Sequence, residues 1–323
     1  MGTLYSIGEV LIDFIPLQKG QALKDVVSFE RAPGGAPANV AAAVSKLGGK
    51  SAMITKLGAD AFGDFLLEKL DEAGVETKHV IRTNEANTAL AFVSLREDGE
   101  RDFSFYRKPC ADLLMTEDEV DESLFASGDI LHFCSVDLVE SPMKHAHIKA
   151  INSAKQRGAL VSFDPNVRLP LWDSPDACRE TILAFIPKAH LVKISDEELE
   201  FITGLSDEKA AIDSLFTGDV KAVVYTRGAA GATLFVNGAE IQADGFSVQV
   251  QDTTGAGDAF IGSFLFKMLE AGTTLENMED VLVRNGKEIV RFANAAGAFT
   301  TTGKGAISAL PSPQQMENML KPR

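Results

Sequence analysis

Cysteine is scarce in this chain, and long apolar runs are missing. The sequence of 323 residues contains three cysteines, Cys110, Cys134 and Cys178, which are too few and too widely spaced for a disulfide framework or a zinc site. No stretch approaches the ~18 consecutive apolar residues of a membrane-spanning helix, and Met1 leads directly into Leu4 to Ile7 without a basic leader. These absences predict a soluble protein of a reducing compartment, the cytoplasm.

Positive charge is also in short supply. The chain has 31 Lys and Arg against 46 Asp and Glu, a formal net charge of −15, and no basic cluster offsets this balance locally. The composition argues against a nucleic-acid partner, and an anionic substrate would need a local basic pocket.

Two common phosphate-binding motifs are absent. The dinucleotide fingerprint fails because Phe260 occupies its third glycine position. The run Gly49-Lys50-Ser51 is no Walker A motif, because Val44 stands where the first glycine should be. A nicotinamide oxidoreductase therefore lacks support in this sequence.

Regular alternation of strand-like and helix-like segments is present from residue 128 onward. With 45% hydrophobic residues, the chain can bury a large core. The alternation predicts one α/β domain over residues 1–323, with a doubly wound, mostly parallel sheet whose sites lie at the carboxyl ends of the strands. The predicted segments are strands 130–134, 160–164, 190–194 and 221–226, and helices 142–157, 175–186, 196–203, 207–216 and about 277–299.

Two segments interrupt this pattern and predict a second, small sheet. Strand-like runs at 89–95 and 101–106 are joined by Glu97-Asp98-Gly99-Glu100, which is typical of a hairpin. A further run over 10–15 contains Asp13, which either faces water or contributes to a site. The small sheet is expected from about 10–33 and 87–112, and such sheets serve as lids or as homodimer surfaces.

The stretch from Asp252 to Asp258 is the strongest candidate for chemistry. It follows a period-two run over 246–251, which predicts a strand, and it precedes an apolar helical stripe that Gly272 ends. Gly255 and Gly257 let successive N–H groups at the helix start point at one anion, and Asp258 adds a carboxylate there. A base of this kind suits a hydroxyl that attacks a phosphoryl group, although a plain helix cap explains Asp258 as well.

Other polar residues also stand beside turns and helix starts. Gly34 and Gly35 precede a helix whose first turn carries Asn39, which predicts close approach of a small polar ligand. Small residues around Asn294 leave room for a flat ligand. Asp164-Pro165-Asn166 reads either as a turn or as part of a site. The remaining residues at predicted strand ends are Arg168, Thr226, Arg227, Gly228 and Gly231.

Together these motifs resemble the ribokinase-like (PfkB-type) carbohydrate kinases over essentially all 323 residues, and the fructokinase branch in particular. The matching segments are Gly8 to Asp13, Ala32 to Ala41, Phe105 to Asp112 and Asp252 to Phe260. The resemblance implies an ATP-dependent kinase that phosphorylates fructose, with Mg²⁺ and a monovalent cation, usually K⁺.

The resemblance also implies residue roles. Asp258 would be the base, with Gly255, Ala256 and Gly257 as the anion hole. Asp252, Thr254 and Gly305 would hold the monovalent cation. The residues implied for the sugar are Asp13, Gly34, Gly35, Asn39, Asn87, Phe105, Arg107 and Arg168. Those implied for ATP and magnesium are Lys193, Glu198, Thr226, Arg227, Gly228, Gly231 and Asn294.

One departure from the family pattern leaves alternatives open. The Asn-x-x-Glu motif associated with magnesium appears here as Ser195-Asp196-Glu197-Glu198, so a direct role of residue 195 is in doubt while magnesium could still bind through water at Glu198. Arg107 and Arg168 could equally face a carboxylate, so 2-keto-3-deoxygluconate is an alternative substrate. A non-catalytic sugar-sensing module is a third reading, but it has no need for Asp258 beside an anion hole.

Overall fold

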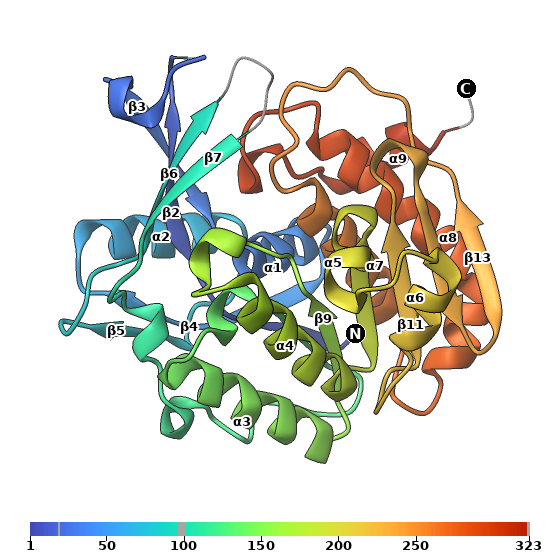
Figure 1. The fold of residues 1–323 in the computed structure, drawn as a ribbon. Helices are drawn as coiled ribbons and strands as arrows, with labels where there is room; N and C mark the ends of the chain where they lie inside the picture. Colours follow the sequence, from blue (N-terminus) through green and yellow to red (C-terminus); the bar gives the residue numbers. More distant parts are fainter. Residues whose placement is uncertain (19, 96–100, 322–323) are drawn as a thin grey trace.

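The computed structural model describes residues 1–18, 20–95 and 101–321, and it contains a large sheet, a small sheet and flanking helices (Figure 1). The helices are Ala36–Lys46 (α1), Ala61–Glu72 (α2), Pro142–Gln156 (α3), Pro175–Phe185 (α4), Asp196–Thr203 (α5), Glu208–Ser214 (α6), Ala256–Glu270 (α7), Met278–Thr300 (α8) and Pro313–Leu320 (α9). Within these described ranges, every helix is too short or too polar to cross a membrane.

The large sheet has nine strands in the order β13-β12-β11-β10-β9-β8-β1-β4-β5. The six strands from β11 to β4 are parallel to one another, and β5 continues the parallel order at one edge, whereas β12 and β13 pair antiparallel at the other edge. The fold prediction is confirmed. The strands are Thr3–Ile7 (β1), Lys50–Gly58 (β4), Val80–Thr83 (β5), Ile130–Cys134 (β8), Leu160–Asp164 (β9), Leu191–Ser195 (β10), Ala222–Thr226 (β11), Ala232–Val236 (β12) and Ala239–Ala243 (β13).

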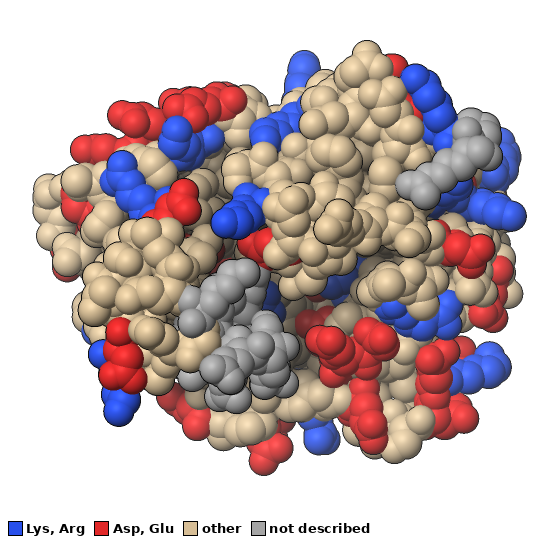
Figure 2. Space-filling model, turned by 90° about the horizontal axis from the view of Figure 1, so that it is seen from above, with Lys and Arg blue, Asp and Glu red and all other residues tan. Residues whose placement is uncertain are grey.

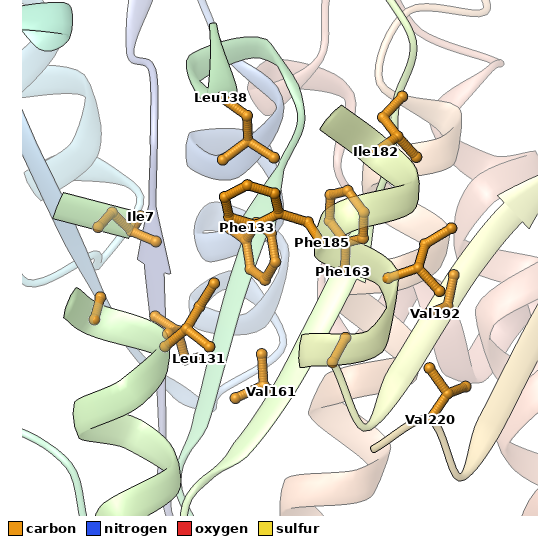
Figure 3. Packing of buried hydrophobic residues seen from close by; sticks show 14 of the residues in the cluster. Ile7, Leu131, Phe133, Leu138, Val161, Phe163, Ile182, Phe185, Val192 and Val220 are labelled. Carbon is orange, nitrogen blue, oxygen red and sulfur yellow. The ribbon is translucent and has the colours of Figure 1, made fainter. Parts of the chain in front are cut away.

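Two apolar layers hold this sheet between its helices. Along β9, Leu160 belongs to the cluster formed with α1, α7 and α8, while Val161 and Phe163 belong to the cluster formed with α3 to α6. Alternate residues of a strand point to opposite faces, so a strand buried on both sides reads as a continuous apolar run. Figure 3 shows the second layer, in which the rings of Phe133 and Phe163 stack with centroids 4.6 Å apart.

The predicted small sheet is present, with the order β3-β2-β6-β7. It comprises Leu11–Pro16 (β2), Phe29–Gly34 (β3), Leu90–Leu95 (β6) and Arg101–Tyr106 (β7), and β6 and β7 pair antiparallel as a hairpin requires. The predicted turn Glu97-Asp98-Gly99-Glu100 lies outside the described residues. Phe14 and Phe92 stack on this sheet at 4.7 Å, so it has an aromatic face of its own.

One strand prediction was wrong. Residues 246–251 form no strand; they follow β13 as irregular backbone. Phe246, Ser247, Val248 and Val250 line a cavity, and the segment pairs with no neighbouring strand in the described part of the chain. The antiparallel strands β12 and β13, which the sequence analysis did not predict, complete the sheet on that side.

Candidate active site

The predicted anion hole lies at the N-terminus of α7, above the carboxyl ends of the parallel strands. Gly255 is the residue before the helix and has φ 74°, a left-handed conformation that favours glycine. A Cβ built on Gly255 would lie 2.7 Å from the Cβ of Ala306, so the segment after α8 closes over this turn. The local requirement for glycine therefore comes from both backbone conformation and space.

Asp258 lies in the first turn of α7 with 7% of its surface exposed. Its Oδ2 accepts a hydrogen bond from Asn39 Nδ2 at 2.8 Å, and its Oδ1 accepts one from Asn166 Nδ2 at 3.1 Å. Burial raises the pKa of Asp258, while the hydrogen bond from Asn39 and the positive charges of Arg168 and Lys193 oppose that rise. A carboxylate held in this way can accept a proton from a bound hydroxyl.

A buried ion pair lies next to this carboxylate. Lys193 Nζ is 3.1 Å from Asp164 Oδ2, and a Cβ built on Gly257 would lie 3.6 Å from the same Nζ. Burial alone would lower the pKa of Lys193, but the carboxylates of Asp164 and Glu198 raise it above its ordinary value. The ammonium therefore stays charged beside the anion hole. Burial raises the pKa of Asp164 to about 7, against the attraction of Lys193.

Glu9 is a further site residue, which stood out in the sequence only as a member of the segment Gly8 to Asp13. Its Oε1 accepts a hydrogen bond from Ala36 N, at the first residue of α1, at 3.0 Å. Burial raises the pKa of Glu9 to about 7, although the guanidinium of Arg107 opposes the shift. The signal in the sequence was its place directly after the first strand, where parallel strands carry their sites.

A cavity of about 320 Å³ contains Asp258. It is bounded by α1, by the small sheet and by the loop after β9. Five residues predicted for the sugar line it, namely Asp13, Gly35, Asn39, Phe105 and Arg168, and Glu9 and Asn166 line it too. Gly34 does not line the cavity but packs against Asp13. A Cβ built on Gly34 would lie 2.1 Å from Asp13 Oδ2.

Two residues predicted for the sugar lie elsewhere. Asn87 is exposed, and its carbonyl accepts a hydrogen bond from Ala111 N at 2.9 Å. Arg107 is 4% exposed, and its Nη2 binds the carboxylates of Asp112 and Asp137, at 2.6 Å from Asp112 Oδ2. Arg107 thus ties the end of β7 to the segment after β8, and it borders a neighbouring cavity instead.

A larger cavity of about 810 Å³ lies on the other side of Gly257. The two cavities share Lys193, Thr253 and Gly257 in their walls. The residues predicted for the nucleotide that line the larger one are Lys193, Thr226, Gly228, Gly231 and Asn294, and Ala256 lines it as well. Asn294 Nδ2 donates to the carbonyl oxygens of Ala243 and Asp244 at 2.9 and 3.1 Å. Arg227 instead donates to Thr233 Oγ1 at 2.9 Å.

Ser195 and Glu198 form a capping box at the start of α5. Glu198 Oε2 accepts from the Ser195 hydroxyl at 2.7 Å, and its Oε1 accepts from Val167 N at 2.8 Å. Burial would raise the pKa of Glu198, but Lys193 and these hydrogen bonds hold it below its ordinary value. Ser195 therefore helps to hold Glu198 as an ionised carboxylate. Each of the two Glu198 oxygens already accepts a hydrogen bond.

The three residues predicted for a monovalent cation come together. Asp252 Oδ1 accepts from the Thr254 hydroxyl at 2.6 Å, and Asp252 Oδ2 accepts from Gly305 N at 3.1 Å. Carboxylate and hydroxyl oxygens are the ligand types that hard cations prefer, so the donor set fits such an ion. Among the described residues, no cluster of three or more His, Cys, Asp or Glu side chains is placed to bind a metal.

Comparison with known proteins places this site in a family. Residues 1–313 match the model of the pfkB family carbohydrate kinase. A probable fructokinase-4 of Arabidopsis thaliana is 44% identical over 320 residues, which are 98% of this chain and 96% of the relative.

Solved structures agree over the same length. The fructokinase of Xylella fastidiosa with bound ATP has a TM-score of 0.89 at 35% identity, covering 98% of both chains. The fructokinase of Vibrio cholerae O395 with fructose, ADP and calcium ion has a TM-score of 0.88 at 33% identity, covering 99% of both chains. A double mutant of that protein holds fructose, ADP and potassium ion. The chain, with its buried aspartate in a polar cavity that adjoins a larger one, belongs to the pfkB family of carbohydrate kinases.

Proposed function

We propose that the protein is a fructokinase, which transfers the γ-phosphoryl group of ATP to the primary hydroxyl of D-fructose and yields fructose 6-phosphate and ADP. The observation that carries the proposal is the position of Asp258, buried in a polar cavity of about 320 Å³ that shares the wall residue Gly257 with a cavity of about 810 Å³. The fructokinases among the relatives support the same choice of sugar.

The reaction needs a base and a site for negative charge. Asp258 takes the proton of the sugar hydroxyl as its oxygen bonds to the γ-phosphorus, and the bond from that phosphorus to the ADP oxygen breaks. The N–H groups of Gly255, Ala256 and Gly257 at the N-terminus of α7 stabilise the charge on the group in transfer. The ammonium group of Lys193, which lies close to Gly257, adds a positive charge that stabilises the same group.

The polar cavity supplies the contacts for the sugar. Asp13, Gly35, Asn39 and Arg168 bind hydroxyls from several sides, and Phe105 covers the ring. Gly34 acts by leaving room for the Asp13 carboxylate. We assign Asn87 and Arg107 supporting roles at the base of the small sheet, which acts as a lid that excludes water. With Arg107 bound to two carboxylates, Arg168 is the arginine of this pair that can meet a substrate, and a carboxylate substrate is the weaker proposal.

The larger cavity supplies the contacts for ATP. Thr226, Gly228 and Gly231 border the phosphates, and Asn294 borders the adenine. Arg227 supports the turn between β11 and β12 through its hydrogen bond to Thr233. A magnesium ion would neutralise phosphate charge when bound, and Glu198, an ionised carboxylate whose oxygens already accept hydrogen bonds from Val167 N and Ser195 Oγ, would hold it through a bridging water. A potassium ion beside the anion hole would bind Asp252 and Thr254, with Gly305 closing that site.

A substrate screen tests this function. ATP consumption by the purified protein is measured with fructose, ribose, glucose, adenosine and 2-keto-3-deoxygluconate, with magnesium present, in potassium and again in tetramethylammonium at equal ionic strength. We expect the highest kcat/KM with fructose and a lower rate without potassium. A higher kcat/KM with any other acceptor would replace fructose, and equal rates in both salts would remove the cation from the proposal.

Assembly and location follow from the same molecule. The small sheet region carries exposed apolar side chains at Leu17, Val27 and Tyr106, which favours a homodimer through this sheet. Light scattering of the purified protein should give twice the 34.6 kDa chain mass, and a single-chain mass would exclude the dimer.

The three cysteines are buried and free, as expected in a reducing cytoplasm. Figure 2 shows clusters of Asp and Glu on one face, with Lys and Arg dispersed between them, which supports a small-molecule partner over nucleic acid.

A further inference from the structure

We propose that Asn39 and Asn166 act as an amide clamp on Asp258, two positioning residues that keep the catalytic carboxylate ionised and aimed at the sugar hydroxyl. This inference rests on the proposed function, because it assigns Asp258 the role of base. It extends that function by giving two side chains a task on the enzyme's own carboxylate, which for Asn39 comes in addition to its proposed contact with the sugar.

The geometry of the clamp is symmetrical about the carboxylate. Asn39 Nδ2 reaches Oδ2 at 2.8 Å, and Asn166 Nδ2 reaches Oδ1 at 3.1 Å. One donor lies in the first turns of α1, and the other lies in the loop that follows β9. Because each oxygen accepts one N–H from a different element, the plane of the carboxylate is fixed from two sides, while a further lone pair on each oxygen remains for a hydroxyl.

The electrostatic setting shows why such donors are needed. Asp258 is 7% exposed, so its ionised form has lost most of its hydration. Arg168 and Lys193 face it with positive charge, but Asp164, Glu9 and Asp13 bring further carboxyl groups into the same neighbourhood. Hydrogen bonds that stabilise only the charged form offset the cost of burial and of these like charges.

The chemistry of an amide makes the clamp selective for the ionised state. An ionised carboxylate accepts hydrogen bonds and donates none, so the attractive arrangement presents an N–H to each oxygen. A proton on either oxygen would meet an N–H and weaken that contact. Asn39 Oδ1 is buried and has no hydrogen-bond partner within the described structure, so Asn39 contributes here as a donor.

The backbone at Asn166 adds a second observation. Asn166 has φ 44°, and its N–H binds Asp164 Oδ1 at 3.1 Å in a tight turn. In the part of the chain that the structure describes, Asn237 is the other residue besides glycine with positive φ, and it lies in the exposed turn between β12 and β13. Left-handed backbone costs free energy for any residue except glycine. At Asn166 that conformation aims the amide at Asp258.

The test removes the amide of Asn166 without straining the backbone. Asn166→Gly keeps the left-handed turn, and Asn237→Gly is the matched control for the gain of flexibility. The carboxyl carbon of Asp258 is followed by ¹³C NMR against pH in protein labelled at aspartate, with Asp258→Asn identifying the signal. We expect the pKa of Asp258 to rise by roughly 1 to 2 units in Asn166→Gly, since a hydrogen bond to a charged group is lost. The control should titrate as the unmodified protein does.

Kinetics give the second readout. A base must be ionised to act, so a higher pKa moves the acid limb of kcat/KM to higher pH by the same amount. At a pH well above that limb, the KM for fructose should stay within about threefold. Asn39→Ala, the second variant, should shift the titration in the same direction.

Contradicting results are equally clear. An unchanged titration in both Asn166→Gly and Asn39→Ala would overturn the clamp. So would a large rise of KM for fructose without a shift of the acid limb in Asn166→Gly, since Asn166 would then contact the sugar instead. The NMR titration needs no substrate, and a shifted pKa in a protein that fails to phosphorylate fructose would reject the proposed function and leave the clamp standing.

Discussion

The cavity around Asp258 is lined largely by charged and amide side chains, whereas the cavity across Gly257 has a larger share of glycines and apolar side chains, although Lys193, Asp196 and Glu197 also line it. Glu9, Asp13 and Arg168 face the first. Gly228, Gly231, Phe246 and Ala298 face the second, and its smaller polar share includes Asn294, whose amide already binds backbone carbonyls. The two sides of one active site therefore recognise their ligands by different means.

This difference implies different sensitivities to mutation. A site that pairs hydroxyls with buried polar groups loses much of its binding when one partner is removed, because the other is left unsatisfied. A site that holds a flat ring by shape loses less when a polar group changes and more when its space is filled. Changes on the sugar side should thus affect the sugar alone, and changes on the nucleotide side should affect ATP alone.

The largest effect is expected at the point where the two sides meet. Asp258→Asn keeps the size of the side chain and removes the base, so kcat should fall by at least ~10² and up to ~10⁴, the range for a lost general base. Binding of ATP, measured by calorimetry without sugar, should be unchanged. Turnover close to that of the unmodified protein would show that Asp258 is not the base.

A smaller loss, confined to one ligand, is expected on the sugar side. Asp13→Ala should lower kcat/KM for fructose by ~10² or more, because the hydroxyls that Asp13 binds are left without a partner. The affinity for ATP without sugar should hardly change. Asp25→Ala, at an exposed position near the same small sheet, is the matched control. Equal losses for sugar and nucleotide would mean that Asp13 supports the fold.

The mildest effect is expected on the nucleotide side. Ala298→Leu places a larger side chain into the wider cavity and should raise the KM for ATP by about tenfold, in line with the usual cost of overpacking. The KM for fructose at saturating ATP should stay the same, and Ala298→Ser should behave as the unmodified protein. If both KM values rose together, the separation of the two cavities would be refuted.

Local sequence patterns predicted many of the helices and strands correctly, but one predicted strand was wrong. The helices α3 to α8 and the parallel strands β8 to β11 follow from apolar periodicity, which is strong where a segment is buried, whereas α9 was not predicted. The same rule was wrong at 246–251, where an alternating segment lines a cavity and forms no strand. It was also silent on β12 and β13, which the sequence analysis left without a prediction although they complete the sheet.

The site residues divide along similar lines. Asp258 with its glycines, Asp13 and Lys193 were named from the sequence, and the structure brings them together around Gly257. Their proposed roles remain predictions for the variants above to test. Glu9 was not singled out, because a glutamate just after a strand is commonplace and its burial depends on what packs over it.

The sequence by itself determined the helix start at Gly255 and the carboxylate of Asp258, which depend on neighbouring residues, and the family, which depends on motifs that can be recognised without knowing their contacts. Only the tertiary structure decided what these groups touch. Asn39 and Asn166 meet Asp258 across 219 and 92 residues of chain, and Arg107 is held by Asp112 and Asp137. Such contacts form only when the strands and helices pack in one particular arrangement. That arrangement depends on packing energies over the whole domain, which a local sequence pattern does not specify.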